Sequence, residues 1–402
     1  MNIALFSDSW FPTKSGIVTV VSQLFECLEK NGHHVVLVTV ASDYEEDNEN
    51  GNILKVPSIP LGLGTDQNYG LPILYKICKF LEKHSIELIH CHTEFNLGRA
   101  AAKAGKHLKI PVICTTHTMW EDFYKFYIPL GEHIPVQVVR TWQKHFFKKF
   151  YALINVSTKA KKYFKQDFMV PEIPSVVIPN AINKSKFQSR EITLEEKKAI
   201  REKYSILPHE KILLFVGRIA GEKRVKELLK ICQDILPRNP DWKAIFVGDG
   251  PILDEVKRIA KNSTANKQII FTGFIDWEKV QAFYGIGDIF MSASMSEMHS
   301  MTILEAEMCS LPIVVRDDSS YYDTVIPEKN GYLSLTDEQM AKDLQELMHN
   351  DEKRKNFGKN SLEFSKDFSI ENYIDKTEKI YKKVLETYPM PITDEVLESS
   401  LL

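Results

Sequence analysis

The sequence predicts an α/β protein with two consecutive domains, each built on a doubly wound parallel sheet. Short runs rich in β-branched residues alternate with longer runs of helical periodicity, an order typical of parallel strands covered by helices on both faces. The alternation stops in a charged, strand-poor stretch at residues 189–210 and then restarts. A length of 402 residues also suits two or three domains of about 150 residues.

The expected elements follow this alternation from the first residues onward. In the first half, helical patterns at residues 18–31 and 71–84 separate expected strands at 2–6, 35–40, 88–91, 112–116, 153–156 and 176–178. In the second half, expected strands are residues 212–216, 244–247, 269–272, 289–291 and 313–315, with helices at 225–236 and 301–308. A last helical pattern at 370–385 has no strand after it, so we expect it to pack back across a domain.

These elements predict domain boundaries. We expect an N-terminal domain at 1–185, a C-terminal domain at 186–370, a crossover helix at 371–388 and an acidic, loosely held tail at 389–402, with a hinge near 180–210. In such parallel sheets ligands bind beyond the carboxyl ends of the strands, so the two domains are expected to face each other across a cleft. We therefore expect the ligand-binding residues in the loops that follow strands.

Composition narrows the class of protein. The chain is 44% hydrophobic and 26% charged, as in ordinary globular proteins, and no apolar run reaches the roughly 18 residues of a membrane-spanning helix. Its N-terminus lacks the basic start and cleavage site of a secretory signal. The six cysteines contain no CxxC pair, which suits reduced thiols. We therefore expect a cytoplasmic protein.

Two glycine-containing loops after expected strands could receive an anion. In FSDSWFPTKSGI, Gly16 opens a helix, where free backbone N–H groups favour negative charge. The loop is not the GxGxxG fingerprint of dinucleotide binding, and Gly16 could simply form a turn. In GDGP, Gly248 would let the backbone approach a ligand closely.

Two cations follow the strand at 212–216. The loop GRIAGEKRV holds Arg218 and Lys223, which could neutralise a diphosphate without a metal ion. The alternative is a charged turn in solvent. We find no convincing acidic metal motif after a strand.

Two carboxylates stand eight positions apart in SEMHSMTILEAE. Glu297 is expected in a loop and Glu305 in the following helix, whose first amides, from Ser300, Met301 and Thr302, could face an anion. If the whole stretch were helical, the two carboxylates would lie about 12 Å apart. At that spacing each could accept hydrogen bonds from hydroxyls of one extended ligand. The alternative is a helix cap for Glu297 and a surface position for Glu305.

Histidines follow two neighbouring strands of the first domain. His117 comes directly after the strand at 112–116 and could exchange protons or hydrogen bonds near neutral pH, or could be structural. In HCHTEF, His90 and His92 point to the same face of a strand and resemble a metal pair. No third ligand has a persuasive spacing, so a metal site is the weaker interpretation.

Together these stretches resemble the GT4 family of glycosyltransferases, which has the GT-B architecture of two Rossmann-like domains. The resemblance covers nearly the whole chain; its strongest parts are GRIAGEKRV, FTGFI and the pair Glu297 and Glu305, with PTKSG and NGYL in support. The segment from HCHTEF to HTMWEDFYKFY is similar to bacterial family members that glucosylate diacylglycerol. Departures include Thr116 in place of tyrosine, Ser310 in place of glycine, and FPTKSGI in place of QINGV.

The resemblance implies a role for each motif. Arg218 and Lys223 would hold the donor diphosphate, Glu305 the ribose hydroxyls and Glu297 the transferred sugar. The amides near Gly16 and Met301 would cradle the phosphates and sugar. His117 would sit beside the sugar, and the base would be lined by Phe274 and Ile275. The family retains anomeric configuration without a metal or other cofactor. On the acceptor side the resemblance places Trp120, Glu121 and Asp122.

The resemblance to lipid-modifying enzymes suggests a membrane-binding role for one basic, aromatic stretch. Residues 140–165 contain eight Lys or Arg and no Asp or Glu. Aromatic and basic side chains alternate near helical spacing there and could lie on anionic lipid headgroups: Trp142, Lys144, Phe146, Phe147, Lys148, Lys149 and Phe150. The alternative is an amphipathic core helix with a solvated basic face. Nucleic acid is a poor rival because no recognition motif accompanies the charge.

The leading hypothesis is therefore a retaining enzyme that moves glucose from UDP-glucose to a lipid. The most favoured acceptor is diacylglycerol at the cytoplasmic face of the membrane. A second hypothesis keeps the fold and the UDP-sugar donor but uses a polysaccharide, sterol or glycolipid acceptor. A third is a nucleotide-sugar-binding module without catalysis. The sequence leaves the sugar, the acceptor and the oligomeric state open.

Overall fold

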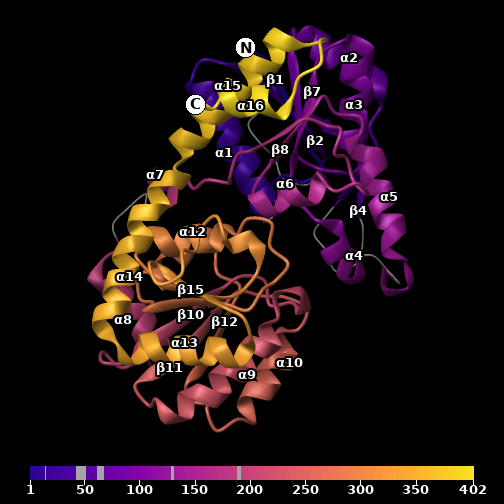
Figure 1. The fold of residues 1–402 in the computed structure, drawn as a ribbon. Helices are drawn as coiled ribbons and strands as arrows, with labels where there is room; N and C mark the ends of the chain where they lie inside the picture. The colour runs from indigo at the N-terminus through magenta and orange to yellow at the C-terminus, as the bar shows by residue number, and fades with distance from the viewer. Residues whose placement is uncertain (14, 42–50, 61–67, 128–130, 188–191) are drawn as a thin grey trace. The chain divides into compact units, whose positions relative to one another are not determined.

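The chain forms two α/β units. The computed structural model describes all residues except 14, 42–50, 61–67, 128–130 and 188–191 (Figure 1). Unit 1 comprises Met1–Asn180 together with Ile370–Leu402, and unit 2 comprises Ala181–Ser369. Each unit contains a parallel sheet with helices packed on it, which confirms the predicted fold class. Residues 188–191 of the expected hinge lie outside the described part of the chain.

Unit 1 is built on a sheet that, over the described residues, has seven parallel strands in the order β3-β2-β1-β6-β7-β8-β9. Every residue of β6 and β7 is buried, so the sheet needs helices on both faces. The strands are β1 (Asn2–Ser7), β2 (His34–Val40), β3 (Ile53–Val56), β6 (Leu88–Cys91), β7 (Val112–Thr116), β8 (Ala152–Asn155) and β9 (Ser175–Val177). A separate antiparallel pair is β4 (Ser58–Pro60) and β5 (Asn68–Gly70).

The helices of unit 1 begin and end where local chemistry allows. Ser15 accepts a hydrogen bond from the Val18 amide and so caps α1. Lys109, in the left-handed conformation, ends α3. The helices are α1 (Gly16–Lys30), α2 (Leu74–Lys83), α3 (Asn96–Leu108), α4 (Trp120–Tyr127), α5 (Val136–Phe147), α6 (Thr158–Phe164), α15 (Ile370–Thr387) and α16 (Asp394–Ser399), with a short 3-10 helix η1 (Gly131–His133).

Unit 2 repeats the plan with strands in the order β12-β11-β10-β13-β14-β15, all parallel within the described residues. These strands are β10 (Lys211–Val216), β11 (Trp242–Val247), β12 (Ile269–Gly273), β13 (Ile289–Ser292), β14 (Ile313–Arg316) and β15 (Gly331–Ser334). The α-helices are α7 (Lys184–Phe187), α8 (Leu194–Lys203), α9 (Val225–Ile235), α10 (Leu253–Lys261), α11 (Trp277–Tyr284), α12 (Met301–Met308), α13 (Asp337–His349) and α14 (Asp351–Phe364). The 3-10 helices are η2 (Gly221–Lys223), η3 (Leu236–Arg238), η4 (Ser319–Tyr321) and η5 (Ser365–Phe368).

The strand orders show where ligands should bind in each unit. In unit 1 the order reverses at β1, which lies between β2 and β6, and in unit 2 it reverses at β10, between β11 and β13. Loops that leave the carboxyl ends of strands on the two sides of such a reversal diverge and leave room for a ligand. The motifs after β1, β6, β10 and β13 therefore occupy the favoured positions of the fold.

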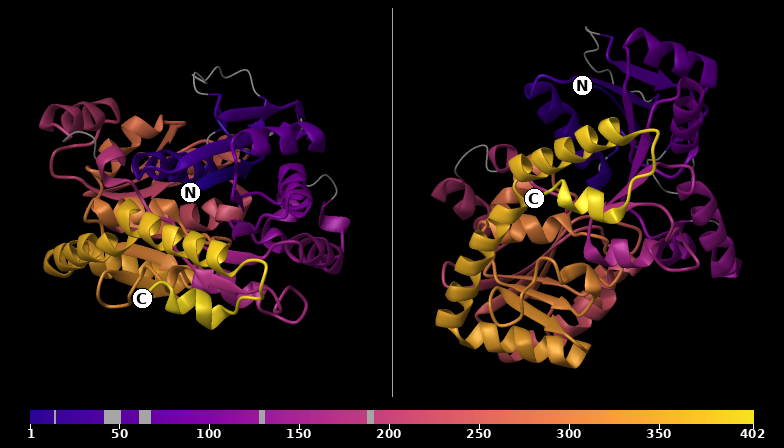
Figure 2. Two further views of the ribbon diagram at one scale, coloured as in Figure 1. Left: turned by 90° about the horizontal axis from the view of Figure 1, so that it is seen from above. Right: turned by 45° about the horizontal axis from the view of Figure 1, so that its top comes forward.

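The C-terminal segment corrects one expectation. Helix α15 packs against α1, and α16 packs against β9, so the chain returns to unit 1 (Figure 2). The loosely held tail predicted at 389–402 is wrong, because its apolar side chains Ile392 and Leu397 are buried. Its acidic Asp394 is also paired: it accepts hydrogen bonds from Lys165 Nζ at 2.8 Å and from the Ser175 amide at 2.9 Å.

Candidate active site

The loops after β10 and β11 in unit 2 pack against each other through glycines. A Cβ added at Gly248 would lie 1.9 Å from the carbonyl oxygen of Gly217, and Gly248 has a φ of +139°. Only glycine tolerates this approach and this conformation. The contact brings the GRIAGEKRV loop, which contains Arg218 and Lys223, beside the GDGP loop. The structure shows a close approach of Gly248 to its neighbouring loop, and the predicted approach to a ligand stays a prediction.

Lys223 and Glu297 form an ion pair. The Lys223 Nζ atom lies 2.5 Å from Glu297 Oε1, and about four fifths of each side chain is buried. A second bond, from Ser296 Oγ to the Glu222 carbonyl oxygen at 3.0 Å, fastens the same two loops together. The structure therefore joins two predicted site residues that are 74 positions apart. Arg218 lies half-buried in the same loop.

The stretch after β13 is only partly helical. Glu297 lies in the loop and α12 begins at Met301, as predicted, so the separation of about 12 Å expected for a continuous helix does not apply. Ser300 is the N-cap residue, but its side chain caps no helix amide; its Oγ lies 3.1 Å from the Thr302 hydroxyl. The first turn of α12 thus lacks the side-chain acceptor that usually caps a helix.

Glu305 is buried inside unit 2. Its Oε2 atom accepts a hydrogen bond from the Tyr284 hydroxyl at 2.7 Å, and its Oε1 atom accepts one from Trp277 Nε1 at 3.2 Å. Burial raises the pKa of the Glu305 carboxyl to about 7, against the lowering effect of these two donors. The alternative of a surface position is therefore excluded. We call Arg218, Lys223, Glu297 and Glu305 the unit 2 cluster.

Helix α11, which follows β12, contacts Glu305 through its first residue, Trp277. Trp277, which binds Glu305, begins α11 just after the predicted base-pocket residues Phe274 and Ile275. Ile275 packs on the core cluster that also contains Ile303, whereas Phe274 is 52% exposed. An aromatic face available to solvent could stack on a planar ligand.

In unit 1, Asp8 connects the first loop with α3. Its carboxylate accepts hydrogen bonds from Thr93 Oγ1 at 2.7 Å and from the Leu97 amide at 3.1 Å, so it caps a helix that has no side-chain cap of its own. Burial raises the pKa of Asp8 to about 6. Gly16 begins α1 at the far end of the same loop and is exposed. Lys14 of the PTKSG motif lies outside the described residues.

His117 lies at the carboxyl end of β7 beside a second histidine. Its Nε2 atom is 3.1 Å from Nδ1 of His92, and burial lowers the pKa of His117 to about 4. His90 bonds instead to Thr115 and Tyr381. Within the described residues, no group of three His, Cys, Asp or Glu side chains could hold a metal ion.

The sequence did not single out Glu94. This side chain is fully buried, which raises the pKa of its carboxyl to about 8, and the indole of Trp120 lies beside it and lowers that pKa in part. Within the described part of the chain, neither Glu94 Oε1 nor Trp120 Nε1 has a hydrogen-bond partner. The carboxyl follows a strand end, in HCHTEF, and that position was the signal that could have found it.

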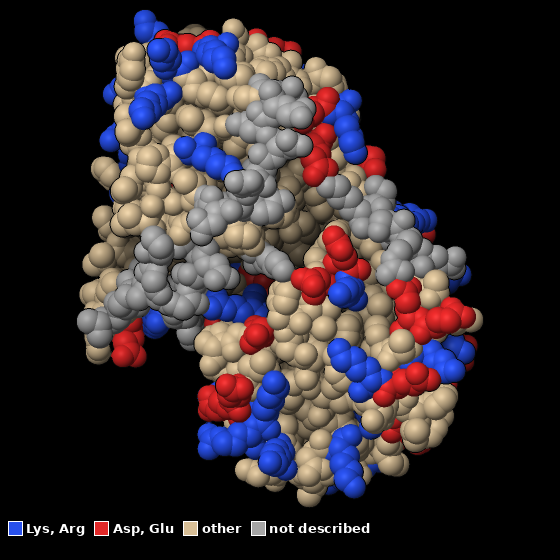
Figure 3. Space-filling model, turned by 180° about the vertical axis from the view of Figure 1, so that it is seen from behind, with Lys and Arg blue, Asp and Glu red and all other residues tan. Residues whose placement is uncertain are grey.

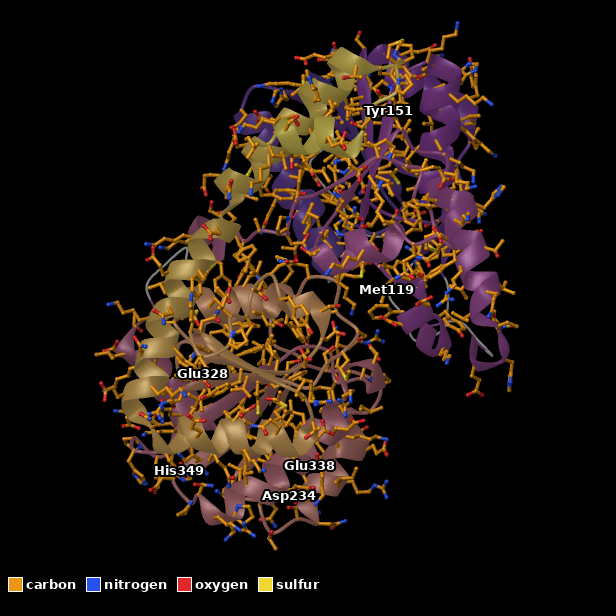
Figure 4. All side chains as sticks on the ribbon, in the orientation of Figure 1. Met119, Tyr151, Asp234, Glu328, Glu338 and His349 are labelled. Carbon is orange, nitrogen blue, oxygen red and sulfur yellow. The ribbon has the colours of Figure 1, made fainter. Side chains whose placement is uncertain are left out.

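The start of α4 is fastened to α5. Glu121 accepts two hydrogen bonds from Arg140, at 2.6 and 3.3 Å, and the Trp120 ring packs edge-on against Trp142. This region follows Met119, which Figure 4 labels in the lower part of unit 1. Asp122 belongs to the first turn of α4, where a negative charge is favourable.

The predicted lipid-binding face of α5 is largely wrong. Phe146 and Phe147 are 1% and 0% exposed because they pack into the core of unit 1, together with Phe150. Two of its cations are also occupied: Lys144 donates to the Asp167 carbonyl oxygen at 3.0 Å, and Lys148 lies 3.2 Å from Glu172. The amphipathic-core alternative therefore describes these phenylalanines. Trp142 is half-buried, and Lys149 is exposed and donates to the His145 carbonyl oxygen.

Two units that each contain a parallel sheet with a switch point fit the GT-B architecture of glycosyltransferases. Residues 14–186 match Glycosyltransferase Family 4, and residues 196–364 match Glycosyl transferases group 1. The alpha-monoglucosyldiacylglycerol synthase of Streptococcus pneumoniae is 31% identical, over 96% of this chain and 92% of that protein. The chain belongs to the GT4 family of glycosyltransferases.

Other relatives agree with this assignment. The alpha-monoglucosyldiacylglycerol synthase of Acholeplasma laidlawii is 27% identical over 96% of this chain and 98% of that protein. Among solved structures, sucrose-phosphate synthase from Thermosynechococcus elongatus has a TM-score of 0.76 at 19% identity, covering 96% of this chain and 99% of that one. Anabaena HepE in complex with UDP has a TM-score of 0.74 at 17% identity, covering 95% and 100%. These structures establish the fold.

The lengths and hydropathies of the helices show whether any could cross a membrane. None in the described part of the chain is both long and apolar enough to span a bilayer.

Proposed function

We propose that the protein transfers glucose from UDP-glucose to diacylglycerol and yields a glucosyl-diacylglycerol. The observation that carries the proposal is the unit 2 cluster, in which two cations and two carboxylates gather on loops and a helix at the switch point. The donor and acceptor are proposed from relatives at 27% and 31% identity whose names specify glucosyldiacylglycerol synthesis.

The unit 2 cluster suits an extended nucleotide sugar. In the proposed complex the ribose hydroxyls donate to the buried carboxylate of Glu305, which Tyr284 and Trp277 hold in place. Lys223 and Arg218 contact the diphosphate, and the uncapped start of α12 adds amide donors. Glu297, bonded to Lys223 before the donor arrives, accepts hydrogen bonds from the sugar hydroxyls.

The proposed reaction is metal-free and retaining. As the bond between the sugar and the diphosphate breaks, negative charge develops on the leaving oxygen, and Lys223 and Arg218 stabilise it. The acceptor hydroxyl attacks from the leaving-group side and gives its proton to the departing diphosphate. In this proposal His117 contacts the sugar and helps to orient it.

The proposed acceptor requires the protein to work on a membrane, as a peripheral protein on the inner face. Support comes from α3, whose exposed charged side chains are all basic, and from Lys149, whose pKa is lowered by partial desolvation and by two of these cations, Arg99 and Lys103. We call Arg99, Lys103, Lys106 and Lys149 the basic stripe. Figure 3 shows mainly Lys and Arg on the upper left of the surface.

The helix next to α3 exposes apolar side chains. Helix α2, which packs against α3, and the segment before it expose Leu71, Ile73, Leu74 and Tyr75, of which Tyr75 is 74% exposed. On an anionic membrane, apolar side chains insert into the hydrocarbon boundary, and neighbouring cations bind the phosphate headgroups. The docking face of the proposal is therefore on α2 and α3, and it replaces the aromatic face first expected on α5.

A donor-by-acceptor activity screen tests the proposal. Purified protein is incubated with UDP-glucose, UDP-galactose or GDP-mannose and with diacylglycerol, glucosyl-diacylglycerol or a soluble glycan, and products are identified by mass. We expect a product with UDP-glucose and diacylglycerol in anionic vesicles. The matched variants are Glu305→Ala, which should lose this activity, and Glu338→Ala, an exposed carboxylate of unit 2 (Figure 4), which should keep it. Transfer only to the soluble glycan would overturn the proposed acceptor.

A further inference from the structure

A column of buried side chains runs from α15 to His117 inside unit 1. Tyr381 of α15 places its hydroxyl 2.6 Å from Nδ1 of His90, and the other nitrogen of His90 lies 2.7 Å from the Thr115 hydroxyl. The ring of His90 packs on the ring of His92, with centroids 4.0 Å apart. His92 in turn reaches His117, with Nδ1 and Nε2 separated by 3.1 Å. We call Tyr381, His90, His92 and His117 the histidine column.

The three imidazoles of the column are neutral near pH 7. Burial lowers the pKa of His90 to about 3 and that of His117 to about 4, and the pKa of His92 lies well below its ordinary value for the same reason. A neutral imidazole has one nitrogen that donates and one that accepts. In the hydrogen bond between Nδ1 of His92 and Nε2 of His117, one nitrogen must therefore carry the proton and the other must accept it.

The surroundings of His92 decide which ring donates. Its Nε2 atom is buried and has no hydrogen-bond partner among the residues that the structure describes. A proton on this nitrogen would be a buried N–H group without an acceptor, and such groups are rarer in proteins than acceptors without a donor. The proton of His92 is therefore on Nδ1, from which it donates to Nε2 of His117. The proton of His117 is then on Nδ1, the nitrogen that His92 does not engage.

We propose that His92 is a positioning residue that fixes His117 as a hydrogen-bond donor through Nδ1, and that Tyr381 stabilises this arrangement through His90. The inference rests on the proposed function, in which His117 contacts the sugar. An N–H donor there binds a hydroxyl oxygen or the ring oxygen of the sugar. It cannot take the proton of the acceptor hydroxyl, so that proton leaves with the diphosphate.

Nitrogen NMR on the whole chain tests the tautomer without any need for activity. Protein is labelled with ¹⁵N-histidine, and the signal of His117 is identified by its loss in His117→Gln. We expect the wild-type shifts of a ring protonated at Nδ1, and in His92→Phe a gain of the Nε2-protonated form, which free imidazole prefers. A wild-type His117 protonated at Nε2, or one unchanged in His92→Phe, would overturn the proposal.

Kinetics separate positioning from a merely structural role. His92→Asn keeps a donor near the place of Nδ1, whereas His92→Leu removes it. We expect kcat with UDP-glucose and diacylglycerol to fall about tenfold in His92→Leu, with KM for UDP-glucose nearly unchanged, and to recover most of this loss in His92→Asn. Equal kcat in wild type and His92→Leu, or equal losses in the two variants, would contradict the proposal.

A matched pair on α15 tests the far end of the column. Tyr381→Phe removes only the hydroxyl that bonds His90, and we expect kcat to fall about threefold. Tyr373→Phe changes another buried tyrosine of the same helix and should leave kcat as in wild type. Identical kinetics for the two variants would remove Tyr381 from the proposal. A wild-type protein without transferase activity would instead refute the proposed function, and the NMR result would still decide the tautomer.

Discussion

At the scale of single residues, the ionisation of Glu305 decides how a ribose can be held. A carboxylate accepts hydrogen bonds on both oxygens, whereas a protonated carboxyl uses one oxygen as a donor. Burial raises the pKa of Glu305 to about 7, so in the empty protein both forms are populated at neutral pH. Tyr284 and Trp277 already use one lone pair on each oxygen, which leaves one on each for two ribose hydroxyls.

Affinity for UDP-glucose should therefore depend on pH. The ionised form predominates above about pH 7, so binding is strongest there and weakens as the pH falls through 7, by about tenfold between pH 8 and pH 6. Calorimetry with UDP-glucose measures this, because its diphosphate has no group that titrates near pH 6. Glu305→Gln should bind about tenfold more weakly at pH 8 and lose the dependence. Retention of the same pH dependence in this variant would show that another group is responsible.

A second prediction concerns the effect of Lys223 on kcat. Lys223→Ala removes a cation that the proposed reaction places on the leaving diphosphate, so kcat should fall by about a hundredfold, while binding of UDP-glucose changes much less. Lys257→Ala, an exposed lysine of unit 2, is the control. A loss of affinity with unchanged kcat would place Lys223 outside the reacting centre.

At the scale of elements, the glycine contact between the loops after β10 and β11 is a structural requirement. Gly248→Ala would force a Cβ to within 1.9 Å of the Gly217 carbonyl oxygen at a φ of +139°. We expect a loss of about 3 kcal/mol in the free energy of unfolding of unit 2, measured by urea denaturation. Gly273→Ala is the matched variant, since its φ is +74° but an added Cβ would meet no described residue beyond its chain neighbours within 4 Å, and it should cost only about 1 kcal/mol. Equal costs would mean that the contact is unimportant.

The sequence predicted most elements because their signal is local. The strands at 88–91 and 112–116 and the helix at 301–308 match β6, β7 and α12 in both bounds, and the other expected strands differ from the observed ones by one or two residues at one or both ends. Strands β3 and β15 were missed, because each is short and lies at an edge of its sheet. The face of α5 was misjudged, because helical spacing puts Trp142 and Phe146 on one side of the helix but does not say whether the protein core or solvent lies opposite.

The candidate site was predictable in its residue types but not in its bonds. Strand ends pointed to Lys223, Glu297 and Glu305 in unit 2 and to His117 in unit 1, because each parallel sheet gathers the loops after its strands at one edge. Partners distant in sequence could not be foreseen: Lys223 meets Glu297 across 74 positions, and His90 meets Tyr381 across 291. Asp8 and Glu94 were overlooked, since only burial turns an ordinary acidic residue into one with a raised pKa.

At the scale of the whole molecule, the proposal requires the protein to bind a membrane without spanning it. Each cation near an anionic surface contributes about 1 kcal/mol, so a triple variant of the basic stripe at Lys103, Lys106 and Lys149 should lose about a hundredfold in binding to anionic vesicles. Sedimentation with vesicles of low and high anionic lipid content measures this, and added salt should weaken the wild type. The control replaces three exposed lysines of unit 2, Lys257, Lys261 and Lys267. Equal losses in the two variants would reject the stripe.

The central claim is that unit 2 receives a nucleotide sugar in its cluster of two cations and two carboxylates. A crystal structure of the protein with UDP-glucose tests it most directly. We predict that both ribose hydroxyls lie within hydrogen-bond distance of Glu305, and that the diphosphate contacts Lys223 and Arg218. A nucleotide bound elsewhere, with Glu305 still bonded only to Tyr284 and Trp277, would contradict the account.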